Sequence, residues 1–129
     1  MKVMILTNNL KVAEDFTERN RMEYLDGETY LNVLCQARDF IHKNHTLLTH
    51  PLSGSIKPNE TPFKSVALSA EAEKFDMQSL EIIENAIATT EKLLKDCKVR
   101  EWPQKILDDF KLIDYNLIKS GIESINQFN

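Results

Sequence analysis

The hydrophobic pattern near the start of the chain predicts two strands. Residues 2–7 are β-favouring and apolar on both faces, as in a central strand that is covered on two sides. Asn8 and Asn9 end this strand, because short amide side chains compete for backbone hydrogen bonds and tolerate turn geometry. Residues 21–25 alternate apolar and polar side chains and predict a second, shorter strand. The polar residues 11–20 between the two are expected to form a short helix or a loop.

Further along, the apolar positions recur with a helical period. They predict a helix over residues 28–43, a third strand over residues 65–69, and two long helices after it. Asp76 is expected to cap the first long helix, over residues 76–96, and Pro103 suits the first turn of the last helix, which should end near residue 125. The side chains expected to face inward are Tyr30, Leu34, Ala37 and Ile41, with Val33 and Phe40 beside them; Leu80, Ile83, Ala86, Ile87 and Leu94; and Ile106, Phe110, Ile113 and Leu117.

This order of elements predicts an α/β fold. The expected architecture is a small three- or four-stranded, mostly parallel sheet packed with helices, with two long C-terminal helices. A chain of 129 residues fits one domain, residues 1–129, and can bury a core without metal or disulfide. In such sheets, ligands bind outside the carboxyl ends of the strands. Asn8, which directly follows the first strand, is therefore a candidate ligand-binding residue.

Charge and cysteine usage narrow the classes of protein. The net charge of −4 argues against a general nucleic-acid binder, which usually carries a basic excess. No apolar run approaches the roughly 20 residues that a membrane span needs, and no targeting segment is evident. Cys35 and Cys97 lie far apart in the sequence and form no ligand pattern, so reduced thiols in a cytoplasmic protein are expected.

The most distinctive stretch of the chain is residues 38–65, with the sequence RDFIHKNHTLLTHPLSGSIKPNETPFKS. It holds all three histidines, His42, His45 and His50, and three of the four prolines. A polar run of this length within a small domain is usually functional or disordered. Prolines restrict the unfolded chain, so we expect one defined shape. We call residues 38–65 the polar block.

The helix before this run places several reactive side chains on one boundary of its apolar face. Cys35, Arg38 and His42 lie together there, with Asp39 just beyond, where packing can hold a side chain that still reaches a ligand. The alternative is that Arg38 and Asp39 pair with neighbouring elements. A histidine beside Cys35 could activate the thiol, but a lone cysteine on an apolar face is more often a small core residue.

The three histidines raise the question of a metal site. His42 and His45 could share a helix face, with His50 reaching in from the loop, and imidazole suits zinc. The spacing matches no established ligand set, and no cysteine pair lies near, so no metal and no cofactor is predicted. Histidines that cap a helix end or bond the following loop explain the pattern better.

The same run also suggests a site for a small anion. Gly54, between Ser53 and Ser55, can turn backbone N–H groups toward a ligand, Lys57 adds positive charge and Thr61 a donor. Neither the Walker pattern nor a Rossmann glycine fingerprint is present. The alternative is a loop that is merely held in shape by its prolines.

The polar block, together with the opening residues KVMILTNN, resembles the GrdX family. These small proteins are encoded beside the glycine, sarcosine and betaine reductase components of amino-acid-fermenting anaerobes. Two positions depart from the family pattern: Asn44 stands where glycine is usual, and Phe63 where tyrosine is usual. Asn44 still tolerates the left-handed conformation of a helix-ending glycine. The resemblance implies an accessory role, in assembly, maturation or regulation of a reductase, and supplies no catalytic residue.

The expected function is therefore that of a cytoplasmic accessory protein that binds a small anion or a partner protein through the polar block. Expected partners are the reductase components or a second copy of the chain, without nucleic acid or membrane. The alternative is a small enzyme that uses its histidines for acid–base chemistry at the carboxyl edge of the sheet. The candidate ligand-binding residues are Asn8, Arg38, Asp39, His42, His45, His50, Ser55, Lys57 and Thr61.

Overall fold

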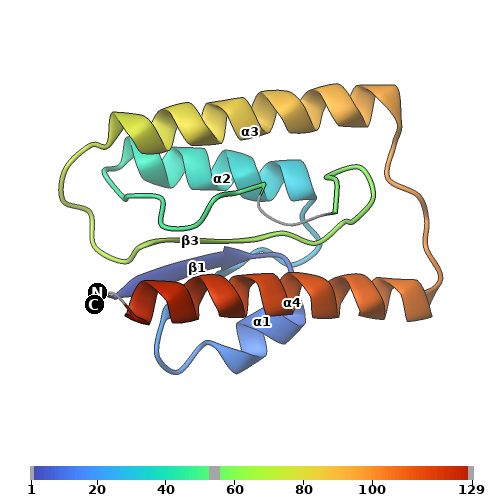
Figure 1. Ribbon diagram of the computed structural model, residues 1–129, viewed down its shortest axis with the longest axis horizontal. Helices are drawn as coiled ribbons and strands as arrows, with labels where there is room; N and C mark the ends of the chain where they lie inside the picture. Colours follow the sequence, from blue (N-terminus) through green and yellow to red (C-terminus); the bar gives the residue numbers. More distant parts are fainter. Residues whose placement is uncertain (1, 53–55, 128–129) are drawn as a thin grey trace.

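A three-stranded sheet lies between two layers of helices in the computed structural model, which describes residues 2–52 and 56–127 (Figure 1). β1 (Val3–Thr7) is the central strand, with β2 (Arg21–Tyr24) parallel on one side and β3 (Ser65–Ser69) antiparallel on the other. All five residues of β1 are buried, which confirms the prediction of a strand covered on both faces.

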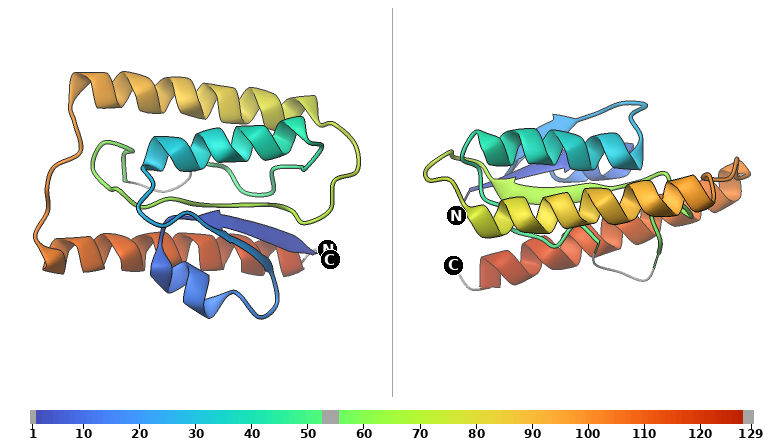
Figure 2. Two further views of the ribbon diagram at one scale, coloured as in Figure 1. Left: turned by 180° about the vertical axis from the view of Figure 1, so that it is seen from behind. Right: turned by 90° about the horizontal axis from the view of Figure 1, so that it is seen from above.

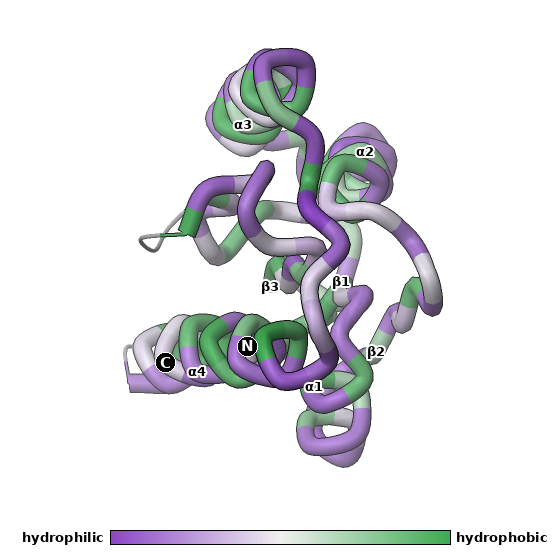
Figure 3. Tube along the Cα trace, turned by 90° about the vertical axis from the view of Figure 1, so that its right-hand side faces the viewer, coloured by the Kyte–Doolittle hydropathy of each residue, from purple (hydrophilic) through white to green (hydrophobic). Residues whose placement is uncertain are grey.

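The helices form one pair on each face of the sheet. α2 (Tyr30–His42) and α3 (Met77–Asp96) cover one face, and α1 (Leu10–Asp15) and α4 (Gln104–Gln127) cover the other (Figure 3). α3 runs alongside α2, as the two views of Figure 2 show. Successive β1 side chains point to opposite faces. Those of Met4 and Leu6 therefore join the core under α2 and α3, and those of Val3 and Ile5 join the core under α4.

The helix boundaries follow from capping residues in the sequence. Asp76 caps α3 as predicted: its carboxylate accepts a hydrogen bond from the Ser79 backbone N–H at 3.1 Å. Thr29 caps α2 in the same way. After α2, Asn44 takes a φ of 75°, the left-handed conformation that the sequence analysis expected it to tolerate.

The prediction of a mostly parallel sheet is wrong, because the sheet is mixed. α2 ends beside the start of β1, where the His45 ring Nδ1 lies 2.8 Å from the Ser69 carbonyl oxygen. The polar block then carries the chain along the whole sheet to the opposite end, where Lys64 meets Asn8. β3 therefore starts at the carboxyl end of β1 and runs antiparallel to it. A short turn after α2 would have produced the parallel strand instead.

On its way, the polar block lies along the outer edge of β3. The Leu48 N–H donates to the Ala67 carbonyl at 2.8 Å, and the Ser69 N–H donates to the Thr46 carbonyl at 2.8 Å. Thr49 adds its side chain, whose Oγ1 accepts from the Ala67 N–H at 3.0 Å. Residues 46–49 therefore satisfy backbone groups of β3 that would otherwise face outward.

The inward face of α4 differs from the one predicted by hydrophobic periodicity. Ile113 and Leu117 were expected to be buried, yet each is 39% exposed. The buried side chains of this helix are Asp114, Ile118 and Ile122. Asp114 turns toward the sheet because Ser65 and Asn9 donate hydrogen bonds to its carboxylate. A polar contact, which periodicity does not detect, decides the rotation of the helix.

Candidate functional site

A closed ring of buried hydrogen bonds joins the carboxyl end of β1 to α4. The Asn9 N–H donates to Thr7 Oγ1 at 3.0 Å, and Thr7 and Ser65 share a 2.6 Å bond between their hydroxyls. The Ser65 hydroxyl donates to Asp114 Oδ2 at 2.7 Å, and the Asn9 side-chain amide donates to the same oxygen at 3.1 Å. Because the Ser65 hydroxyl donates its hydrogen bond to Asp114, Thr7 is the donor in the bond between the two hydroxyls. The ring locks four side chains in one orientation.

The Asp114 carboxyl is held in a setting that favours its protonated form. Burial raises the pKa of Asp114 above its ordinary value, and the hydrogen bonds from Ser65 and Asn9 offset only part of this effect. The carboxyl also lies near Lys64, whose positive charge lowers the pKa of Asp114, as the two hydrogen bonds do. An acid of this kind, at the end of a central strand, is typical of sites that bind or transfer protons.

Lys64 is a buried cation in the residue before β3. Its side chain is 6% exposed, and its ammonium lies 5.5 Å from the centre of the Tyr30 ring. Among the described residues, Lys64 Nζ makes no salt bridge and no hydrogen bond. Burial lowers the pKa of Lys64 to about 8, and the nearby Asp114 charge opposes this shift only in part.

A small cavity brings these groups together. Its volume is about 20 Å³, room for a single water-sized group. Tyr30 from α2, Lys64 from the polar block and Asp114 from α4 line it, together with Thr61. The remaining lining is apolar: Ile56, Phe63, Phe110, Ile113 and Leu117. Burial raises the pKa of Tyr30 as well, so its hydroxyl stays protonated and can act as a donor.

Asn8 fixes the backbone around this cavity. Its side-chain amide donates to the carbonyl oxygens of Glu28 and Pro62, each at 2.8 Å, and its Oδ1 accepts from the Lys64 N–H at 2.9 Å. Asn8, Glu28 and residues 62–64 are far from one another in the sequence. Asn8 therefore holds the loop after β2 and the end of the polar block against the end of β1.

An open cleft of about 700 Å³ lies at the same edge. The linker between α3 and α4 crosses this end of the sheet (Figure 3). It supplies Arg100 and Trp102 to the cleft, and the Arg100 guanidinium lies 5.5 Å from the centre of the Trp102 ring. Phe63 lines both the cleft and the small cavity, so the two spaces adjoin at this residue.

The structure places two of the predicted site residues, Asn8 and Thr61, at this edge. Arg38 lies elsewhere and pairs with Glu84 of α3 at 2.9 Å. Asp39, His42 and Lys57 are exposed, and the His42 ring stacks on Phe75 with centroids 6.3 Å apart. Ser55 lies outside the described residues.

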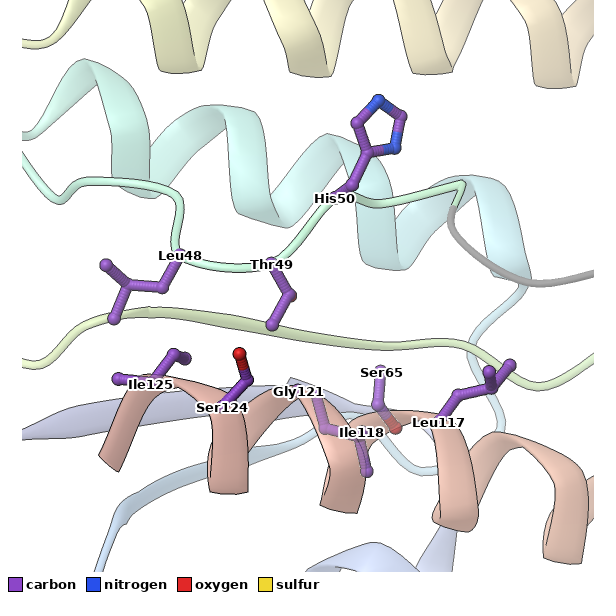
Figure 4. A pocket seen from close by; sticks show the side chains of 9 residues that line it. All are labelled: Leu48, Thr49, His50, Ser65, Leu117, Ile118, Gly121, Ser124 and Ile125. Atoms are coloured by element: carbon purple, nitrogen blue, oxygen red, sulfur yellow. The ribbon is translucent and has the colours of Figure 1, made fainter. Parts of the chain in front are cut away.

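The remaining two histidines are also apart from the Lys64 cavity. His45 is buried, with Nδ1 against the Ser69 carbonyl and its ring edge-on to Phe40. His50 lines a cavity of about 330 Å³ between the polar block and α4. Figure 4 shows its ring directed away from the Ser65 and Ser124 side chains on the opposite wall. Of the described residues that line this cavity, His50 is the one histidine.

The described residues show no arrangement that supports a reactive thiol or a metal site. Burial raises the pKa of the Cys35 thiol, outweighing the opposing effect of Arg38, so the group is less reactive than an ordinary thiol. Within residues 2–52 and 56–127, no three His, Cys, Asp or Glu side chains gather closely enough to share a metal ion. Nor does any helix in this part of the chain have the length and apolar character to cross a membrane.

Sequence reasoning missed three residues of the site: Tyr30, Lys64 and Asp114. Tyr30 was assigned to the core, where most of its ring lies. Lys64 directly precedes β3, four of whose five residues are buried, and a charge in that position is a weak indication of a buried group. Asp114 sits between Ile113 and Tyr115 and was not singled out from the sequence. Only the folded chain brings the three together.

The fold and site define a small three-layer α/β protein with a cluster of buried polar side chains at the carboxyl edge of its central strand. The family model for GrdX-like proteins matches residues 4–123, so the chain belongs to the GrdX-like protein family. A search of the curated proteins finds no match, and a search of the solved structures finds none.

Proposed function

We propose that this protein is a non-catalytic accessory protein that binds a small anion at the carboxyl edge of β1. The end of the polar block, from Thr61 to Lys64, forms the site together with Asn8. The observation that carries the proposal is Lys64, a residue that is 6% exposed, lines the small cavity and makes no salt bridge among the described residues.

A bound anion would supply the salt-bridge partner that Lys64 lacks among the described residues. A buried ammonium is costly unless it is paired and hydrogen-bonded. Asp114 compensates only in part, since its carboxylate already accepts two hydrogen bonds and the pKa of Lys64 remains lowered to about 8. A bound carboxylate or phosphate oxygen would favour the charged form of Lys64. Binding near pH 8 should therefore be accompanied by proton uptake.

The two neighbouring spaces suit a ligand with a small charged end. The cavity at Lys64 admits one water-sized group, and the cleft beyond Phe63 has room for the rest of a metabolite. The charges that line the cleft include Arg100 and Lys111 as well as Asp26, Glu28 and Glu101. The cleft itself is thus mixed in charge, and Lys64 would provide the selection for an anion.

Titration calorimetry at pH 7 with propionate and with phosphate tests this proposal. We expect Lys64→Met to weaken binding at least tenfold, whereas Lys57→Met, a change of an exposed lysine in the same block, leaves it unchanged. Equal affinity of the wild type and Lys64→Met would refute the anion site. So would the absence of binding of both ligands to the wild type.

We also propose that the cellular setting is the glycine, sarcosine or betaine reductase system, with a reductase component as the partner protein. Family membership supports this setting. Three exposed apolar side chains of α4 offer a contact surface: Leu112, Ile113 and Leu117. Purified reductase components should bind the immobilised chain, and Leu112→Lys should weaken that binding. If each purified component fails to bind the wild type, the partner proposal is wrong.

Acid–base catalysis by His42, His45 and His50 is the competing function. It would be supported by a cavity that holds two histidines, and the His50 cavity does not do so. The bond from the His45 ring to a backbone carbonyl fits a structural role. The geometry therefore favours binding over histidine chemistry.

A further inference from the structure

Three ionisable side chains from three separate elements converge on the small cavity. They are the Tyr30 phenol at the start of α2, the Lys64 amine before β3 and the Asp114 carboxyl in α4. Ser65 and Asn9 donate hydrogen bonds to the Asp114 carboxylate, and Lys64 Nζ lies 5.5 Å from the centre of the Tyr30 ring. This grouping places a primary amine next to two groups that can donate protons.

We infer that Lys64 forms a reversible imine with a small carbonyl compound, an aldehyde or a 2-oxo acid, at this cavity. The amine lone pair attacks the carbonyl carbon, a C–N bond forms, and the carbonyl oxygen takes up a proton. The Asp114 carboxylate takes a proton from the nitrogen and passes it to the hydroxyl, the C–O bond breaks and water leaves. The resulting iminium, with its new C=N bond, returns the remaining proton to solvent. Amine and carbonyl give imine and water, so the step needs neither oxidant nor reductant.

The state of the Lys64 amine supports this chemistry. Only a neutral amine can attack a carbonyl. With a pKa of about 8, roughly one tenth of Lys64 is neutral at pH 7, against about one in 3,000 for a lysine at the ordinary value of 10.5. A larger share of Lys64 than of an exposed lysine is therefore neutral at pH 7. The ionisable groups that line the cavity with it are Asp114 from α4 and Tyr30 from α2.

The surroundings of Lys64 suit the dehydration step. Asp114 lines the same cavity, and burial raises the pKa of its carboxyl, so it accepts a proton from the nitrogen more readily than an exposed aspartate and can pass it on. Phe110, Ile113 and Leu117 give the cavity an apolar wall. Phe63 lines both the cavity and the cleft, from which a carbonyl compound would reach Lys64.

The inference rests in part on the proposed function, because both ideas bring a small ligand to Lys64. The two ideas nevertheless fail separately. Propionate carries a carboxylate without a reactive carbonyl, and propanal carries the carbonyl alone. If propionate binds but no carbonyl compound is trapped on Lys64, only the imine is refuted. If propanal is trapped on Lys64 while propionate and phosphate do not bind, only the anion site is refuted.

The test is reductive trapping on the full chain at pH 7. The protein is incubated with pyruvate or with propanal and cyanoborohydride, and the modified lysines are identified by peptide mass spectrometry. We expect the initial rate of modification at Lys64 to exceed that at exposed Lys57 at least tenfold. Asp114→Asn should slow modification at Lys64 severalfold and leave that at Lys57 unchanged. Modification of Lys64 no faster than Lys57 with both compounds would overturn the inference.

A fold control keeps the result interpretable. Lys64→Arg retains the charge and removes the nucleophilic amine, and its thermal unfolding is compared with that of the wild type. A folded Lys64→Arg protein should lose the fast phase of modification and keep the slow phase of the exposed lysines. If the fast phase persists in this variant, another lysine is the reactive one and the assignment to Lys64 is wrong.

Discussion

The buried Lys64 lowers the free energy of unfolding by an amount that depends on pH. Its pKa is lowered to about 8 from 10.5, so between these values the unfolded chain binds more protons than the folded one. Stability rises with pH wherever this holds. The penalty is complete below about pH 8 and disappears toward pH 10.5.

We therefore expect Lys64→Met to stabilise the protein by about 1–3 kcal/mol at pH 7. The gain should shrink as pH rises from 8 to 10.5, because the wild-type lysine is then neutral in the fold. Urea unfolding of both proteins at pH 7, 8, 9 and 10 measures the difference. A gain that stays constant over this range would show that the Lys64 charge is not destabilising.

Asp114 should be replaceable by asparagine far better than by alanine. In Asp114→Ala, the Ser65 hydroxyl and the Asn9 amide lose their acceptor inside the protein, which should cost about 2–4 kcal/mol. In Asp114→Asn, the amide oxygen can still accept, and the cost should stay near 1 kcal/mol. Chemical denaturation of the two variants measures both values. Equal losses would mean that the carboxylate charge, rather than its accepting oxygen, stabilises α4 against the sheet.

Residue-level chemistry was predictable where it depends on local backbone. Asp76 as a cap and Asn44 in a left-handed conformation were both expected from their immediate neighbours, and both are confirmed. Asp114 shows the limit. Its burial depends on Ser65 and Asn9, which are distant in sequence, and no local pattern reveals those partners.

Among the elements, α4 comes close to the polar block at Gly121. A Cβ added there would lie 2.9 Å from Thr49 Cγ2. Thr49 cannot simply rotate away, because its Oγ1 accepts from the Ala67 N–H of β3. The absence of a side chain at residue 121 therefore lets α4 lie against the polar block.

We expect Gly121→Ala to destabilise the protein by about 1–2 kcal/mol, although alanine favours a helix by about 1 kcal/mol over glycine. Adding Thr49→Ser removes the crowding methyl and keeps the hydroxyl, so the double variant should recover most of the loss. Thermal unfolding of the two single variants and the double variant completes the cycle. A double variant no more stable than Gly121→Ala would exclude this contact as the cause.

The elements themselves were predictable, but the direction of β3 was not. Every strand and long helix lies within a few residues of its predicted range, because hydrophobic periodicity is a local property. The direction of β3 depends on where the polar block ends, which is set by hydrogen bonds such as that from the Lys64 N–H to Asn8. Nothing in the alternation of apolar residues in β3 encodes that direction.

At the scale of the whole molecule, Asn8 joins segments from three parts of the chain. Asn8→Ala would leave the carbonyls of Glu28 and Pro62 and the Lys64 N–H without this partner. We expect a loss of about 2–4 kcal/mol and faster amide hydrogen exchange at Lys64. Asn32→Ala, which removes an exposed amide, should cost less than about 0.5 kcal/mol. Unchanged exchange at Lys64 in Asn8→Ala would contradict this role.

The candidate site was only partly predictable at this scale. The carboxyl edge of β1 follows from a general property of α/β sheets, and Asn8 was placed there from its position after the strand. Thr61 was chosen for its hydroxyl and lies at the same edge. Ligand binding by either residue remains a prediction. Tyr30, Lys64 and Asp114 meet only through tertiary packing, so their cavity could not be predicted from spacing along the chain.

The pairing of residues 46–49 with β3 affects the tendency of the protein to aggregate at high concentration. Exposed strand edges recruit strands from other molecules and so begin aggregation. Residues 46–49 occupy the β3 edge, and the opposite edge is the four-residue β2, where Arg21 and Glu23 pair at 3.0 Å. A short edge strand with charged side chains offers few backbone groups with which a strand of another molecule can pair. The polar block thereby protects the protein from adding strands edge to edge.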